Sequence, residues 1–365
     1  MIHYKFSKHI NKQFAHTLRA RVNDYFKENQ LSKNANPQMI GKSIFVLSLY
    51  LVPLIVMLLL GISNVWLLFA LWIIMGIGKA FVGTSVMHDA LHGSYSRKKS
   101  VNLLMGFSAF MIGANPKIWQ IQHNVLHHTY TNIEHADEDI VTPSYLLRFT
   151  PNQPLKWYHK YQHLYAGFLY GISTLTWITI KDFIKVFQYR GDGLIKNKKD
   201  FNKIFLTIVL QKIFYLFTFV VLPMLILPVS PWLVVAMFVT MHFVTGLLLT
   251  LIFQTAHVMP TSEFIMQEEE EIEENWWVHQ LLTTTNYATS SRLFSWMIGG
   301  LNFQIEHHLF PNICHVHYPK IARIVKSTAA EFNLPYYVQK SFRSAVAQHF
   351  VLLRLLGRKT NYKLA

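Results

Sequence analysis

The stretch VWLLFALWIIMGIGKAFVGTSVMHDALH, residues 65–92, shows most directly how this chain folds and where its chemistry lies. Residues 65–87 carry a single charged side chain, Lys79, and are long enough to cross a membrane as one helix. The stretch ends on His88 and His92, which are four residues apart and therefore share one face of a helix. The sequence thus predicts a membrane helix with a pair of histidines at one end.

Three more apolar segments, 44–62, 204–229 and 232–255, predict further membrane helices. Very short links join the four segments into two hairpins. Of the 365 residues, 52% are hydrophobic and only 15% are charged, against about a quarter in ordinary soluble proteins. We therefore expect an all-α integral membrane protein with four transmembrane helices in two hairpins, and a helical cytoplasmic cap that holds a di-metal site.

Two other apolar segments, 101–119 and 163–180, are interrupted or short, and the sequence leaves open whether they cross the membrane or only dip into it. Residues 10–26 show a basic amphipathic pattern with an apolar residue at every fourth position. Such a helix can lie on lipid headgroups or pack on the protein's own cap. The expected division is an N-terminal segment 1–43, a membrane domain 44–326 and a C-terminal tail 327–365.

The formal net charge is +15, and lysines and arginines flank the hairpins but are absent from their tight links. This asymmetry predicts that both termini and the long middle segment are cytoplasmic. A positive charge in an apolar chain indicates a membrane surface with anionic lipid, and we expect no nucleic-acid partner. The acidic run 268–274 is expected to be a solvated loop.

The remaining candidate ligands follow the first pair and share its pattern. They are His123, His127 and His128 in one cluster, Gln304, His307 and His308 in another, and His257 just after the fourth apolar segment. Imidazole suits iron, zinc and copper, and eight imidazoles are too many for one ion. The H-E-x-x-H and Glu-x-x-His metal motifs are absent, so a histidine-rich di-iron centre beside the membrane fits best.

Four carboxylates lie in or beside the clusters: Asp89, Asp137, Asp139 and Glu306. A metal-bound imidazole usually donates its other N–H to a carboxylate or a carbonyl, which fixes the orientation of the ring. These acids are therefore candidate partners of the ligands. The alternative for each is a solvated acid near a basic surface, just as His257 can be an ordinary histidine at the membrane interface.

The motifs H-D-A-L-H (88–92), H-N-V-L-H-H-T-Y-T-N (123–132) and L-N-F-Q-I-E-H-H-L-F-P (301–311) resemble the three histidine boxes of membrane fatty acid desaturases. The resemblance extends from about Phe45 to Lys326 and includes Q-T-A-H at 254–257. Glutamine at the start of the third box resembles the front-end branch, which places a double bond between an existing one and the carboxyl end.

This resemblance implies two iron ions, with O2 as co-substrate, a long-chain acyl substrate linked to coenzyme A or to lipid, and all eight histidines as ligands. It implies that Gln304 binds iron weakly, through water, or not at all. Many front-end members carry a fused cytochrome b5 domain, but no H-P-G-G haem motif occurs here. The expected electron donor is a separate cytochrome b5, ferredoxin or similar carrier. The alternatives are a di-iron membrane hydroxylase of lipid and, outside enzymes, a membrane metal transporter.

Overall fold

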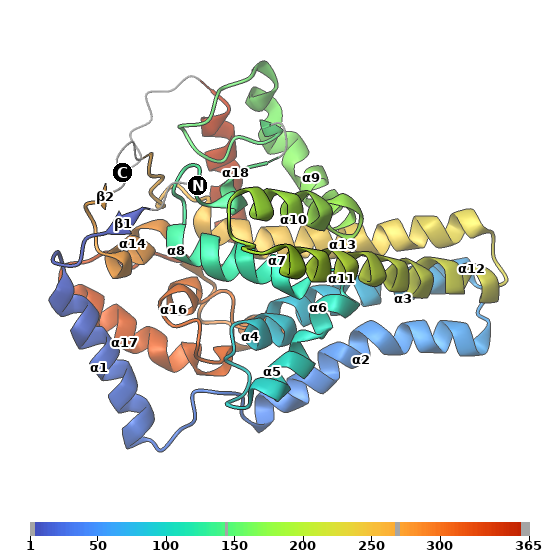
Figure 1. Cartoon of the computed structure of the whole chain (residues 1–365), viewed down its shortest axis with the longest axis horizontal. Coiled ribbons are helices and arrows are strands. Elements are labelled where there is room, and N and C mark those ends of the chain that lie inside the picture. Colours follow the sequence, from blue (N-terminus) through green and yellow to red (C-terminus); the bar gives the residue numbers. More distant parts are fainter. Residues whose placement is uncertain (1–3, 143–144, 267–270, 359–365) are drawn as a thin grey trace. The chain divides into compact units, whose positions relative to one another are not determined.

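The computed structural model describes residues 4–142, 145–266 and 271–358 (Figure 1). It consists of two compact units, each built from separate stretches of chain. Unit 1 comprises Met1–Asn36, Gln122–Ala166 and Leu251–Ala365, and unit 2 comprises Pro37–Ile121 and Gly167–Thr250. The sequential boundaries at residues 43 and 326 stay a prediction. The start of the acidic run 268–274 lies outside the described residues.

Within the described residues, four helical segments are long and apolar enough to cross a membrane, which confirms the four predicted spans. They are α2 (Pro37–Leu60), Val65–Leu91, Lys198–Ile226 and α13 (Pro231–His257). The second segment runs through α3 (Val65–Phe81), a π-helical turn (Val82–Met87) and α4 (His88–Leu91), and the third through α11 (Lys198–Leu216), a π-helical turn (Phe217–Val221) and α12 (Leu222–Ile226).

Local sequence explains how these helices start and how the first hairpin packs. The side chain of Asn64 accepts a hydrogen bond from the backbone N–H of Leu67 at 3.0 Å and so caps α3. A Cβ atom on Gly78 would lie 2.7 Å from the backbone nitrogen of Tyr50, so only glycine allows α3 to approach α2 this closely. The hairpin is therefore specified by a cap at its link and a glycine at its contact.

Each of the two ambiguous apolar segments is divided among several helical elements. Residues 101–119 fall into α5 (Lys99–Gly106), α6 (Ser108–Met111) and α7 (Pro116–Gln120). Residues 163–180 fall into α9 (Gln162–Thr176) and a π-helical turn (Trp177–Lys181), and α10 (Asp182–Gly191) follows. Neither segment is among the membrane-capable helices found in the described residues.

Unit 1 is also mostly helical, with two parallel pairings of two-residue strands, β1 (Lys5–Phe6) with β2 (Glu271–Ile272) and β3 (Asn286–Tyr287) with β4 (Val338–Gln339). Its helical elements are α1 (Lys12–Glu28), a π-helical turn (Ile121–His127), α8 (His128–Tyr130), 3₁₀ turns at Glu138–Ile140, Trp157–Tyr161 and His315–His317, α14 (Trp276–Thr283), α15 (Arg292–Met297), α16 (Gln304–Leu309), α17 (Tyr318–Glu331) and α18 (Phe342–Leu356).

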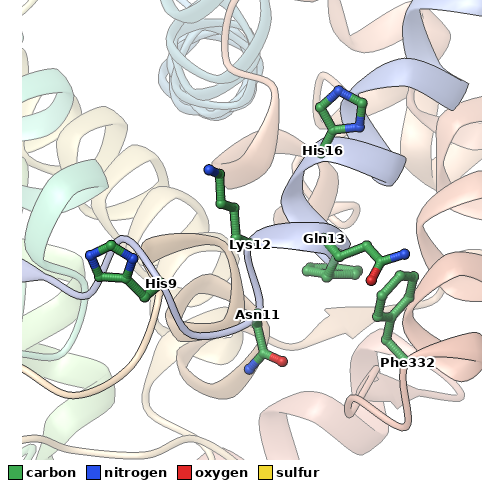
Figure 2. Close-up of a pocket in the computed structure, with 7 residues that line it drawn as sticks. His9, Asn11, Lys12, Gln13, His16 and Phe332 are labelled. Carbon is green, nitrogen blue, oxygen red and sulfur yellow. The ribbon is translucent and has the colours of Figure 1, made fainter.

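The amphipathic N-terminal helix α1 packs on the protein itself. Its residues Phe14, Leu18, Val22 and Phe26 are buried in one core cluster with side chains of α14, α16 and α17. A surface cavity of about 650 Å³ opens at the start of this helix, lined by His9, Asn11, Lys12, Gln13, Phe14, His16 and Phe332 (Figure 2). None of the box histidines lines this cavity, so the predicted metal centre has to be sought elsewhere.

Candidate metal centre

The second histidine cluster lies on a π-helical turn, Ile121–His127, and not on the α-helix that its spacing predicts. The wider turn brings residues five apart together, and the Nε2 atoms of His123 and His128 are 3.2 Å apart. His123 and His127 still stack, with ring centroids 5.3 Å apart. The predicted pair is therefore close in space, but the helix type is a correction, and the wider turn also brings His128 into contact with His123.

Among the described residues of unit 1, two groups of three histidines form, and the ligand atoms within each group lie within 4.8 Å of one another. The first group joins His127 to His257, the last residue of α13, and to His308 of α16. The second joins His128, His307 and the same His308. All five side chains are buried. The structure thus brings together histidines that are widely separated in the sequence.

The chemistry of this cluster fits a transition-metal site. The Nε2 atom of His257 is buried and makes no hydrogen bond within the usual geometric limits in the described residues, although the Gln304 side chain is close enough to interact with this ring. Both amide atoms of Gln304, which is 1% exposed, likewise make no hydrogen bond within the usual geometric limits in the described part of the chain. Buried polar atoms without partners are costly, so a metal ion that accepts a lone pair from His257 Nε2 and from the amide oxygen of Gln304 would satisfy both atoms. A set of imidazoles at this spacing suits iron, copper or zinc.

A carboxylate holds the ring of His127. Both oxygens of Asp137 lie 3.1 Å from His127 Nδ1, and Asp137 in turn accepts hydrogen bonds from the backbone N–H groups of Asn132 and Asp139, each at 2.9 Å. Burial lowers the pKa of His127, but the Asp137 carboxylate outweighs this and raises it to about 9. A side-chain oxygen of Asp139 lies 3.5 Å from the same nitrogen.

Other rings are held by residues that the sequence did not indicate. Gln280 of α14 accepts a hydrogen bond from His308 Nδ1 at 2.8 Å and another from Thr131 at 3.1 Å. The hydroxyl of Tyr318 lies 3.3 Å from His307 Nδ1. With Nδ1 engaged in this way, Nε2 is the nitrogen that each ring presents to a metal. Gln280 and Tyr318 become neighbours of the boxes only through the tertiary fold, so no local pattern points to them.

Glu306 lies inside the third cluster, but its carboxylate is hydrogen-bonded to residues outside the histidine clusters. It is fully buried and accepts hydrogen bonds from Asn286 at 2.8 Å and from Tyr336 at 2.9 Å. Burial raises the pKa of Glu306 to about 7, against the lowering effect of these two hydrogen bonds. These contacts tie α16 to the β3–β4 pair, so Glu306 positions the third box through the backbone.

The first cluster belongs to unit 2. His88 begins α4 and His92 caps its end, and their ring centroids are 4.6 Å apart. Trp119 packs edge-on against both rings, at 5.7 Å from His88 and 5.6 Å from His92. An oxygen of Asp89 is 3.9 Å from His88 Nδ1, which is beyond hydrogen-bond distance. The predicted pair therefore shares one face and is covered by a tryptophan.

Comparison with known proteins identifies the architecture that carries these clusters. The family model described as fatty acid desaturase matches residues 64–340. The chain belongs to the fatty acid desaturase family. It is therefore a membrane enzyme, an oxidoreductase of lipid metabolism, and the alternative of a metal transporter is set aside.

Several curated relatives align over almost the whole of this desaturase. An acyl-lipid (8-3)-desaturase of Physcomitrium patens is 38% identical over 95% of this chain and 72% of its own length. An sn-1 linoleoyl-lipid 6-desaturase of Arthrospira platensis is 33% identical over 94% of this chain and 92% of its own. The Delta(5) fatty acid desaturase A of Dictyostelium discoideum is 33% identical over 98% and 78% of the two chains.

Proposed function

We propose that this protein is a front-end acyl-lipid desaturase whose histidine clusters hold two iron ions. The proposed ligands are His88, His92, His123, His127, His128, His257, His307 and His308, with Gln304 as a weak or water-mediated ligand. The observation that carries the proposal is the pair of three-histidine groups in unit 1, which share His308. The lipid-linked substrates in the names of two relatives support the acyl-lipid class.

The protein's own residues orient the imidazole rings of this site and exclude bulk water from it. Asp137 and Gln280 fix two rings so that Nε2 faces inward, and burial keeps bulk water from the reacting chain. Two bound iron ions would supply the reduction of O2 to two waters, with two electrons and two protons from outside and two hydrogens from adjacent methylenes. The acyl chain of a membrane lipid is the natural source of such methylenes.

The charge pattern supports a cytoplasmic site. Basic residues flank the membrane hairpins, and neither tight link between paired spans carries one. We propose that both termini and the eight proposed ligand histidines lie on the cytoplasmic side, with the electrons arriving from a separate donor. Reporter fusions at residues 62 and 229 would test the orientation, since both positions are expected on the opposite side from the termini.

Expression in a host without front-end desaturases, fed defined polyunsaturated acyl chains, tests the activity. Gas chromatography with mass spectrometry should find a new double bond on the carboxyl side of an existing one. The variants His127→Ala and His308→Ala should make no product, whereas His349→Asn, outside the clusters, should remain active. A hydroxylated chain would support the lipid hydroxylase in place of the desaturase. Full activity in both alanine variants would overturn the ligand assignment.

The metal and the electron donor need separate measurements. Purified protein should contain about two iron ions per chain by mass spectrometry of the metal, and chelation should remove product formation until iron is restored. Reconstitution with cytochrome b5 in one series and with ferredoxin in another identifies the class of donor. Active protein with zinc alone, or without bound metal, would contradict the proposal.

A further inference from the structure

A buried ion pair lies inside unit 2, and none of the histidines of the three boxes belongs to it. Lys212 of α11 and Asp182, the first residue of α10, are 6% and 0% exposed, and Lys212 Nζ lies 2.6 Å from an Asp182 oxygen. Lys212 is part of a membrane-capable segment. Charged pairs in such segments are expensive to desolvate, and an apolar pair of the same volume is often at least as stable. The pair therefore calls for an explanation beyond stability.

The ion pair is hydrogen-bonded to the backbone of residues 113–115, the segment that leads into α7. Lys212 Nζ donates to the carbonyl oxygens of Gly113 at 2.8 Å and Trp177 at 2.9 Å, and Asp182 accepts a hydrogen bond from the backbone N–H of Asn115 at 3.2 Å. Gln211, next to Lys212, donates to the carbonyl of Ala114 at 2.7 Å. Each of the three consecutive residues 113–115 is thus held by its backbone.

Local geometry transmits this hold to α7. Gly113 has a φ of +87°, and a Cβ there would lie 2.5 Å from Ile178, so the segment has little freedom to shift. The side chain of Asn115 caps α7 by accepting from the backbone N–H groups of Lys117 at 3.0 Å and Ile118 at 3.2 Å. The start of α7 is therefore fixed in both position and direction.

The other end of α7 touches the first histidine box. Trp119 packs edge-on against His88 and His92, and Gln120 Nε2 donates to the carbonyl of Leu91 at 3.2 Å. A continuous series of contacts thus runs from the ion pair through residues 113–115 and α7 to the histidine pair, all of it within unit 2.

We infer that the Lys212–Asp182 pair is a positioning device for the first histidine box, acting through α7 and Trp119. The effect of the pair on metal binding rests on the proposed function. The mechanical link, by which the pair restrains residues 88–92 through residues 113–120, does not. Replacing both charges, Asp182→Asn with Lys212→Met, releases residues 113–115 without leaving an unpaired buried charge. Asn115→Ala, a milder change, removes the cap of α7 and leaves the ion pair in place.

Hydrogen–deuterium exchange of the metal-free protein in detergent tests the link directly. Both variants should exchange faster in peptides covering 113–120 and 88–92. The control Thr245→Val removes another buried polar contact of unit 2, the hydrogen bonds of this hydroxyl to the carbonyls of Gly76 and Met241, and should leave both peptides unchanged. Faster exchange at 113–120 with no change at 88–92 in both variants would overturn the inference.

Iron titration of the same proteins then measures the functional consequence. Variants that elute from size-exclusion chromatography like folded wild-type protein should bind Fe(II) about threefold to tenfold more weakly. This is at or below the lower end of the effects seen when a direct partner of a metal-bound histidine is lost, because the ion pair acts through α7. Unchanged affinity in folded variants would overturn the positioning role. Wild-type protein that binds no iron would contradict the proposed function, while the exchange result would still decide the mechanical link.

Discussion

Replacing Asp137 by asparagine keeps the shape of the side chain and removes the charge that faces His127. Both carboxylate oxygens are 3.1 Å from Nδ1, and Asp137 is 1% exposed, so solvent screens this contact very little. Losing such a partner typically costs about 10- to 100-fold in metal affinity, or about 1.4–2.7 kcal/mol. We expect Asp137→Asn to fall in this range.

The measurement is an anaerobic Fe(II) titration of metal-free protein in detergent against a competing chelator. Asp139→Asn is the matched control, because its oxygen is 3.5 Å from the same nitrogen and its side chain is 30% exposed. This contact is weaker and partly screened by solvent, so Asp139→Asn should lower the Fe(II) affinity by less than about threefold. Affinity of Asp137→Asn within twofold of wild type, or an equal loss in Asp139→Asn, would refute the reasoning.

Three other outcomes are expected. Gln280→Leu should weaken Fe(II) binding about tenfold because His308 loses its acceptor, whereas Gln162→Leu, an equally buried glutamine bonded to backbone carbonyls, should lower only the melting temperature. Burial lowers the pKa of His349 from 6.5 to about 4, so the folded state favours the neutral imidazole. The free energy of unfolding should therefore be unaffected by this group above about pH 6.5 and should fall by about 3 kcal/mol as the pH falls to 4. In an acid titration of metal-free protein, the His349→Asn variant should show a smaller loss. Gly78→Ala should destabilise the protein by about 1–3 kcal/mol in thermal unfolding, because a Cβ there would lie 2.7 Å from a backbone nitrogen of α2.

The membrane segments could be predicted from sequence because the signal is local. A run of apolar residues such as 65–87 identifies a span without reference to any other part of the chain, and all four expected spans are present. The ends of the spans are predicted less accurately than their existence. The first span begins at Pro37, ahead of the predicted start at residue 44, because Lys42 lies inside the helix and is only 2% exposed.

The candidate site was only partly predictable. The spacing of the histidines predicts the clusters, and Asp137 is close enough to His127 in the sequence to be a candidate partner of a ligand. Gln280 was missed because it meets His308 only after α14 and α16 pack together. The π-helical turn at Ile121–His127 was also missed, since the spacing of its histidines fits an ordinary α-helix equally well.

That turn has a consequence for how the enzyme can change during evolution. A π-helical turn is an α-helix that holds one surplus residue, and each residue rotates an α-helix by about 100°. Deleting one residue between His123 and His128 would convert the turn to an ordinary α-helix and reduce the spacing of these two histidines from five residues to four, so the contact that the wider turn creates between them would be lost. Insertions and deletions in this stretch should therefore be absent from active lineages, even where the intervening side chains drift freely.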